Sequence, residues 1–201
     1  TLSLHDALPI SPMNLPRKGN ERMVIPMKKM LAMLLAVLTL CFGAAAMAES
    51  VPEVDDAAEQ AALADLTANG QLIEGDGFQF YIPADWEAAE LTDEETEAGY
   101  VFAAASADEA NQLIITYQAL DAAKTAEEVQ PGLAEVYPTA TVMDLNGTSV
   151  VAFHDADEDV LGIVVMDTVD PGYYIFMFTP ASDADFLPVA DAIAASYTAA
   201  Q

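Results

Sequence analysis

An acidic run between two predicted strands is the pattern in this sequence that most resembles a chemical site. Asp155, Asp157 and Asp159 follow the spacing of the first three ligand positions of a calcium-binding loop. The rest of that motif does not follow, because its sixth position is Val160 rather than glycine and its twelfth is Met166 rather than glutamate. The pattern favours a solvated hairpin loop, with weak divalent-cation binding by the three aspartates as the alternative.

Nucleophilic catalysis lacks its usual residues. Cys41 is the only cysteine, and His154 is the only histidine beyond residue 48. Ser149 precedes His154 in one predicted strand, but no nucleophile-elbow motif surrounds it. The sequence also has no phosphate-binding glycine loop, no dinucleotide fingerprint and no set of zinc ligands. We therefore predict no catalytic residues, no cofactor and no enzyme.

Paired carboxylates are the one catalytic chemistry that the composition allows. Of the 33 acidic residues, Asp6 and Glu21 precede residue 49 and 31 follow, so no particular pair stands out. Two functions remain open. The first is an exported, non-catalytic binding or accessory domain, and the alternative is a carboxylate-dependent hydrolase acting on envelope or dietary glycans. Two close carboxylates with perturbed pKa values in a concave pocket would favour the hydrolase.

Charge narrows the choice of partner. Lys124 is the only lysine or arginine beyond residue 48, which leaves a formal charge of −30 over the following 153 residues. Such a surface repels phosphate backbones and anionic lipid, so we expect neither nucleic acid nor a membrane as a partner after the leader is removed. An unknown protein or envelope component is the expected partner, and cationic groups and divalent ions are the compatible chemistry.

The first 48 residues are predicted to lie outside the mature fold. Residues 1–10, TLSLHDALPI, resemble a translated sequencing adapter, and 11–26 are interpreted as upstream read-through. Residues 27–48 have the order of a signal peptide: Lys28 and Lys29, an apolar run, and Ala46-Met47-Ala48 as the cleavage site. A retained membrane anchor is the alternative, although the run is at the short limit for a spanning helix. The signal predicts a secreted or cell-envelope location.

The remaining chain is predicted to hold an acidic linker or weak helix over 49–70 and a single α+β domain over 71–201. Alternating apolar residues indicate a strand at 78–82, and further strands are expected at 100–105, 113–120, 140–145, 149–154, 160–168 and 173–179. Asn146-Gly147 and Pro171-Gly172 are hairpin and turn dipeptides, and links this short join antiparallel strands. Thr125 and Glu128 have capping-box spacing before a short helix that contains Pro131, and Ser182 is expected to cap the closing helix.

Three features together resemble the Mog1/PsbP-like fold. They are Phe78-Gln79-Phe80-Tyr81-Ile82-Pro83 with Trp86, the Asn146-Gly147 hairpin, and the closing helix, within residues 75–197. The chain is also similar to small secreted proteins of unknown function from gut Firmicutes. The resemblance implies a mainly antiparallel sheet packed by helices on both faces, an α/β/α sandwich. Because that family includes photosystem accessory proteins and a binder of a small GTPase, the resemblance also implies a binding or accessory role.

The leader generates the first testable prediction. We expect a native-like bacterial host to export the protein and cleave it after Ala48, since small residues occupy the positions that signal peptidase recognises. The intact mass of the secreted protein should then correspond to a chain that begins at Glu49. A cell-bound species that retains residues 27–48 would contradict this prediction.

Overall fold

A computed structural model describes residues 50–75 and 77–199, so the predictions for 1–26 and 27–48 lie outside the described residues. In chain order the elements are α2 (Asp56–Asn69), β1 (Gln71–Gly75), β2 (Phe78–Ile82), β3 (Glu87–Ala88), α3 (Asp93–Glu97), β4 (Tyr100–Ala105), β5 (Gln112–Ala119), α4 (Ala126–Ala134), β6 (Thr141–Leu145), β7 (Thr148–Asp155), β8 (Val160–Met166), β9 (Gly172–Thr179), α5 (Leu187–Ala195) and β10 (Thr198–Ala199). None of the described helices has the length and apolar character that crossing a bilayer requires.

Seven strands form the main sheet, in the order β3-β4-β5-β9-β8-β7-β6, and every neighbouring pair is antiparallel. Tight turns determine this topology. Between β6 and β7, Asn146 and Gly147 take φ values of 49° and 84°, a left-handed conformation that asparagine and glycine tolerate best. Thr148 is the first residue of β7, so Asn146 and Gly147 form the turn of the predicted hairpin.

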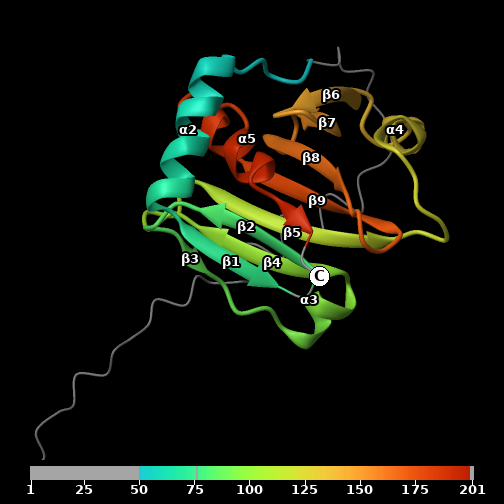
Figure 1. Cartoon of the computed structure of the whole chain (residues 1–201), viewed down its shortest axis with the longest axis horizontal. Coiled ribbons are helices and arrows are strands. Elements are labelled where there is room, and N and C mark those ends of the chain that lie inside the picture. The colour runs from blue at the N-terminus through green and yellow to red at the C-terminus, as the bar shows by residue number, and fades with distance from the viewer. Residues whose placement is uncertain (1–49, 76, 200–201) are drawn as a thin grey trace, which may run out of the picture.

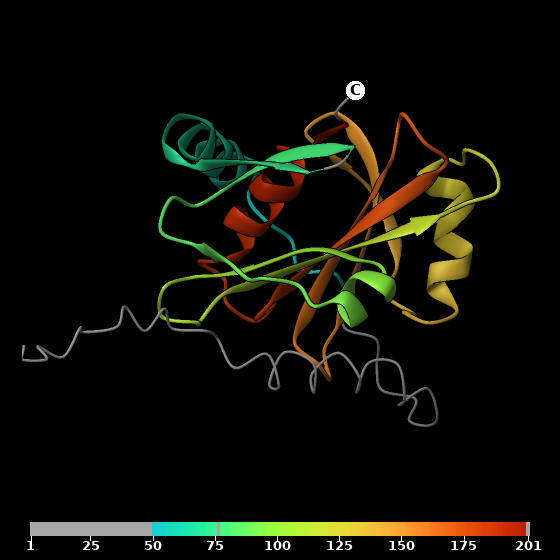
Figure 2. The ribbon, with the colours of Figure 1, turned by 90° about the horizontal axis from the view of Figure 1, so that it is seen from below.

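Helices lie on both faces of the main sheet, as Figures 1 and 2 show. On one face α4 packs over β7 and β8 through Val129 and Leu133. On the other face lie α5, α2 and a second sheet of three strands in the order β1-β2-β10. The predicted fold class, an α+β domain with a mainly antiparallel sheet covered by helices on both faces, is confirmed. The small second sheet was not predicted, because β1 and β10 are short and without regular alternation.

The central strands are buried on both faces. In β8, Ile163 contributes to the core under α5, whereas its neighbour Val164 contributes to the core under α4. Successive strand residues point to opposite faces, so an unbroken apolar sequence is what a strand with two covered faces requires. The ring of Phe153 covers Gly162 on the adjacent strand, where an added Cβ would lie 2.0 Å from the ring.

Residues 49–70 contribute a helix of the folded unit. Asp55 begins α2 by accepting hydrogen bonds from the backbone N–H groups of Ala57 and Ala58, and the helix ends at Asn69, with Gly70 as its C-cap. Leu66 is only 5% exposed and belongs to the main core, and α2 packs against α5. The core therefore begins before residue 71.

The closing helix begins later than its sequence predicts. Ser182 does not cap it, since both its backbone N–H and its hydroxyl donate to the carboxylate of Asp159, each at 2.8 Å. The helix starts at Leu187 instead, with Pro188 in its first turn, where a missing N–H costs no hydrogen bond. Because Ser182 hydrogen-bonds to the carboxylate of Asp159, its side chain does not cap the closing helix.

Five aromatic residues of the main core are buried: Phe78, Phe80, Trp86, Phe176 and Phe178. Phe80, from the small sheet, meets Phe176 of the main sheet edge-to-face with ring centroids 5.6 Å apart. We expect Phe80→Ala and Phe176→Ala each to reduce the free energy of unfolding by about 3–5 kcal/mol. Urea denaturation would measure this loss, with Leu72→Ala as the control because Leu72 is 45% exposed. A loss no larger than that of the control would show that the two sheets do not pack through these rings.

Candidate functional site

Two of the three aspartates of the calcium-like pattern, Asp155 and Asp159, accept hydrogen bonds within the protein. Asp155 accepts hydrogen bonds from the N–H groups of Asp157 and Glu158, and Asp159 accepts from Ser182. Asp159 also has a φ of 56°, which turns the chain into β8. Within the part of the chain that the structure describes, no group of three or more histidine, cysteine or acidic side chains is placed to hold a metal ion. The arrangement is that of a hairpin loop.

Ser149 and His154 do not form a nucleophile–base pair. Both lie on β7, and five residues of strand separate them by about 16 Å of backbone. The Ser149 hydroxyl donates instead to the Glu127 carboxylate at 3.2 Å. The backbone N–H of His154 donates to the Thr139 hydroxyl, which in turn donates to the His154 carbonyl, both at 2.8 Å. His154 thus holds the segment before β6 against the end of β7.

A carboxylate pair with raised pKa values lies between α2 and α5. Asp191 on α5 is only 6% exposed, and burial together with the nearby charge of Glu59 raises its pKa to about 7. Burial also raises the pKa of Glu59, as do the charges of Asp56 and Asp144. A carboxyl group with a pKa near neutrality is what a general acid needs, so the raised pKa values are one of the two features, with a concave pocket, that the hydrolase alternative predicts. Neither residue, however, lines the groove described next.

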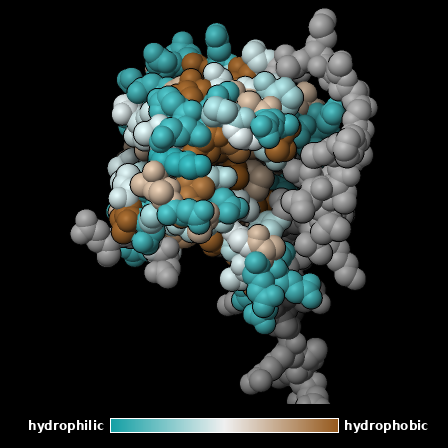
Figure 3. Space-filling model, turned by 90° about the vertical axis from the view of Figure 1, so that its right-hand side faces the viewer, coloured by the Kyte–Doolittle hydropathy of each residue, from teal (hydrophilic) through white to brown (hydrophobic). Residues whose placement is uncertain are grey.

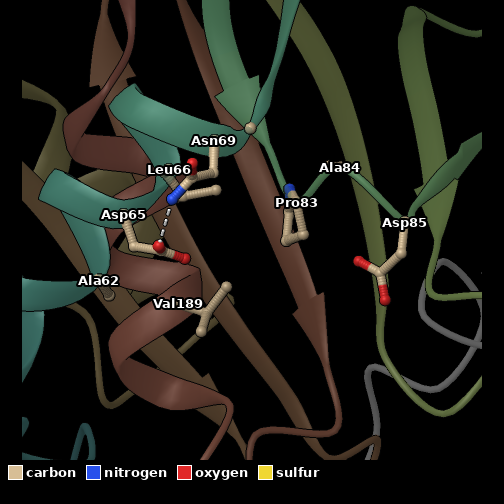
Figure 4. A pocket seen from close by; sticks show the side chains of 9 residues that line it. Ala62, Asp65, Leu66, Asn69, Pro83, Ala84, Asp85 and Val189 are labelled. Atoms are coloured by element: carbon tan, nitrogen blue, oxygen red, sulfur yellow. Dashed lines mark hydrogen bonds between the residues drawn. The ribbon is translucent and has the colours of Figure 1, made fainter.

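A groove of about 380 Å³ lies between the C-terminal half of α2 and the loop that follows β2. Figure 4 shows its two walls, with Asp65 and Asn69 on α2 and Asp85 on the loop. We call this the α2 groove. Gly70 and five apolar residues complete its lining: Ala62, Leu66, Pro83, Ala84 and Val189.

Gly70 allows the two walls of the α2 groove to approach each other. A Cβ at this position would lie 2.5 Å from the carbonyl oxygen of Leu66 and 2.6 Å from that of Ile82. Any larger residue would force the end of α2 away from the end of β2, since neither backbone can move cheaply. Glycine is thus required here by close backbone approach.

Gln71 holds the loop wall in place. Its side-chain amide donates to the carbonyl oxygens of Ala84 at 3.0 Å and Trp86 at 2.9 Å, with a longer contact of 3.3 Å to Pro83. The Trp86 ring is 6% exposed and packs on Phe186 at a centroid distance of 5.9 Å. The loop is therefore anchored at both ends, and the groove exists before any ligand binds.

The polar groups of the α2 groove are suited to binding a cation. The side-chain amide of Asn69 donates to one carboxylate oxygen of Asp65 at 2.8 Å, which leaves the other oxygen available. The Asp85 side chain is exposed and makes no hydrogen bond or ion pair within the described residues. The lining contains no serine, cysteine, histidine or lysine, so it offers two negative charges beside an apolar floor and no nucleophile.

Sequence reasoning did not identify this groove. It predicted a linker or weak helix up to residue 70 and a strand that ends at 82, and the groove is lined by residues next to these two ends, Asn69, Gly70 and Pro83. Asp65 and Asp85 are 20 positions apart, and no sequence motif relates them. Only the antiparallel pairing of β1 with β2, which returns the chain beside α2, brings them to facing walls.

Solved structures with a similar chain path include two proteins. The cyanobacterial PsbP of Synechocystis, CyanoP, is 14% identical, and the match covers 66% of this chain and 94% of that chain with a TM-score of 0.48. A protein of Bacteroides thetaiotaomicron is 13% identical over 66% of this chain, with a TM-score of 0.47. The matched region spans about half, 49%, of that second protein. No family model and no curated protein matches the sequence.

The buried Asp191 generates a pH prediction. The folded protein holds the Asp191 proton up to a pH of about 7, whereas the unfolded chain releases it near pH 4. Because the folded state binds more protons in this window, stability should fall as pH rises from about 4 to about 7. Asp191→Asn should flatten that fall, measured by thermal melting across the window.

Asp121→Asn is the matched control, since it removes one exposed carboxylate from the loop before α4. It keeps any pH dependence that arises from general repulsion among the acidic residues. An Asp191→Asn variant with the same pH slope as this control would show that Asp191 ionises normally in the folded state.

Proposed function

We propose that this protein is an exported, non-catalytic binding or accessory domain whose partner is cationic. The observation that carries the proposal is the α2 groove, a preformed hollow that presents Asp65 and Asp85 beside apolar residues without any nucleophile. Lys124 is the only lysine or arginine among the described residues, so the protein itself supplies almost no counter-charge.

The surface as a whole supports this class of partner. Figure 3 shows one side of the molecule, on which hydrophilic side chains surround a smaller number of apolar ones. A strongly negative surface attracts cationic proteins from a distance and accelerates their association, and it repels anionic ones. Long-range electrostatic attraction therefore selects cationic partners before they touch the protein. A specific complex also needs a local binding site, such as the α2 groove.

Export is the second part of the proposal. The charged, apolar and small-residue segments of 27–48 support a signal peptide, and the 153 residues that follow contain no cysteine. A domain that has no thiol requires neither oxidation nor reduction to fold, so its packing is compatible with an extracytoplasmic location. The cell envelope or the surrounding medium is therefore where we expect the partner.

The hydrolase alternative rests on one observation, the raised pKa values of Asp191 and Glu59. Asp191 is buried against α2, and a glycan would have to displace that helix to reach it. The α2 groove, which a ligand can enter, holds Asp65 and Asp85 instead. The geometry thus favours binding over hydrolysis.

An oligolysine peptide and an oligoglutamate peptide of equal length test the proposal. We expect the chain that begins at Glu49 to bind the first and not the second, with an affinity that falls as salt rises, because screening weakens exposed charge pairs. Isothermal titration calorimetry would measure both. Absence of oligolysine binding at low salt would contradict the proposal, and cleavage of envelope glycans that Asp191→Asn abolishes would establish the hydrolase instead.

A further inference from the structure

The α2 groove combines an apolar floor with a carboxylate on each of two opposing walls. Leu66 and Val189 form part of the floor, Asp65 lies on α2, and Asp85 lies on the facing loop, as Figure 4 shows. We propose that the α2 groove binds the side chain of a lysine presented by a protein partner. This inference rests on the proposed function and names the group that the cationic partner inserts.

The shape of a lysine side chain matches this lining. Lysine has a four-carbon apolar stem that packs along apolar surface while its ammonium group reaches polar atoms. The volume of about 380 Å³ is near the lower end of the range for small-ligand pockets, roughly 300–1,000 Å³, and so suits one side chain better than a folded surface. The stem would lie over Leu66, Val189 and Pro83, and the ammonium would reach the free oxygen of Asp65 or the carboxylate of Asp85.

The two carboxylates favour lysine over the other cations considered. They come from separate elements, α2 and the 83–86 loop, and the Asn69 amide already occupies one oxygen of Asp65. A compact ammonium needs only one free carboxylate oxygen, whereas arginine prefers to contact both oxygens of one carboxylate with two parallel hydrogen bonds. A divalent ion needs more oxygen ligands, and no group of three or more metal-ligating side chains is found in the described part of the chain.

Nothing in the described chain occupies the proposed ammonium position. Lys124, its only lysine, precedes α4, which packs on the opposite face of the main sheet from α2 and α5. Gly70 and Gln71 already hold the walls together, so a partner would not have to order them on binding. Preformed sites of this kind lose less entropy when a ligand binds.

Two short peptides that differ only in stem length test the inference. One is an acetylated, amidated Ala-Lys-Ala peptide, and the other replaces the lysine with diaminobutyric acid, whose side chain carries the same charge at this pH on two carbons instead of four. The titrations are followed by amide NMR shifts at about pH 6, where the lysine amine is fully protonated. We expect the lysine peptide to bind more tightly and to shift the amides of Leu66, Gly70, Ala84 and Val189.

Substitutions distinguish binding in the α2 groove from electrostatic attraction by the whole acidic surface. Asp65→Asn with Asp85→Asn should weaken binding of the lysine peptide roughly threefold to thirtyfold, the range that two exposed ion pairs provide. Asp121→Asn with Glu135→Gln removes the same charge from the segments that flank α4 and should have a much smaller effect. Ala62→Leu leaves every charge in place but fills the α2 groove, so it should also weaken binding.

Equal binding of the two peptides, or equal effects of the two double variants, would show that the groove does not recognise lysine. The proposed function would stand in that case if oligolysine still bound, since attraction would then come from the whole surface. Failure of both oligolysine and the lysine peptide to bind at low salt would instead refute the proposed function.

Discussion

The contact between Phe80 and the main sheet is the interaction on which the rest of this structure depends. Phe80 is fully buried and meets Phe102 and Phe176 edge-to-face, with ring centroids 5.2 and 5.6 Å apart. These contacts hold the small sheet over the large one, and together with α5 they close one side of the core. Since β2 leads directly into Pro83 and Ala84, the same contact determines where the loop wall of the α2 groove stands relative to α2.

Electrostatics imposes the second constraint. A chain with this excess of acidic residues has few ion pairs available, so its stability must come from apolar packing and from hydrogen bonds between carboxylates and backbone N–H groups. Asp55, Asp155, Asp167 and Asp183 each accept such bonds at a turn or helix end. Asp191 is the only acidic residue among the described buried ones, and it remains there because its proton can be retained near neutral pH.

The position of the groove follows from both constraints. Gly70 permits α2 and β2 to approach, Gln71 holds the loop, and Asp65 and Asp85 remain at the surface, where water solvates them. Binding a lysine side chain would place a positive charge where the protein has none of its own. The lining of the α2 groove contains no serine, cysteine or histidine, and its only ionisable groups are these two carboxylates.

The sequence by itself determined most of the strands and the antiparallel pairing of those joined by short links, because two-residue periodicity and turn chemistry are local properties that the fold keeps. The strands predicted at 78–82, in the small sheet, and at 100–105, in the main sheet, have the predicted bounds, and the one predicted at 160–168 ends at Met166. Only the tertiary structure decided the rest. The helix over 56–69 is stable because it packs on α5, Ser182 is drawn away from the closing helix by Asp159, and Asp65 faces Asp85 through the β1–β2 pairing. Each of these three features depends on a contact between residues that are distant in the sequence. Such contacts form only in the folded chain, so local sequence patterns do not predict them.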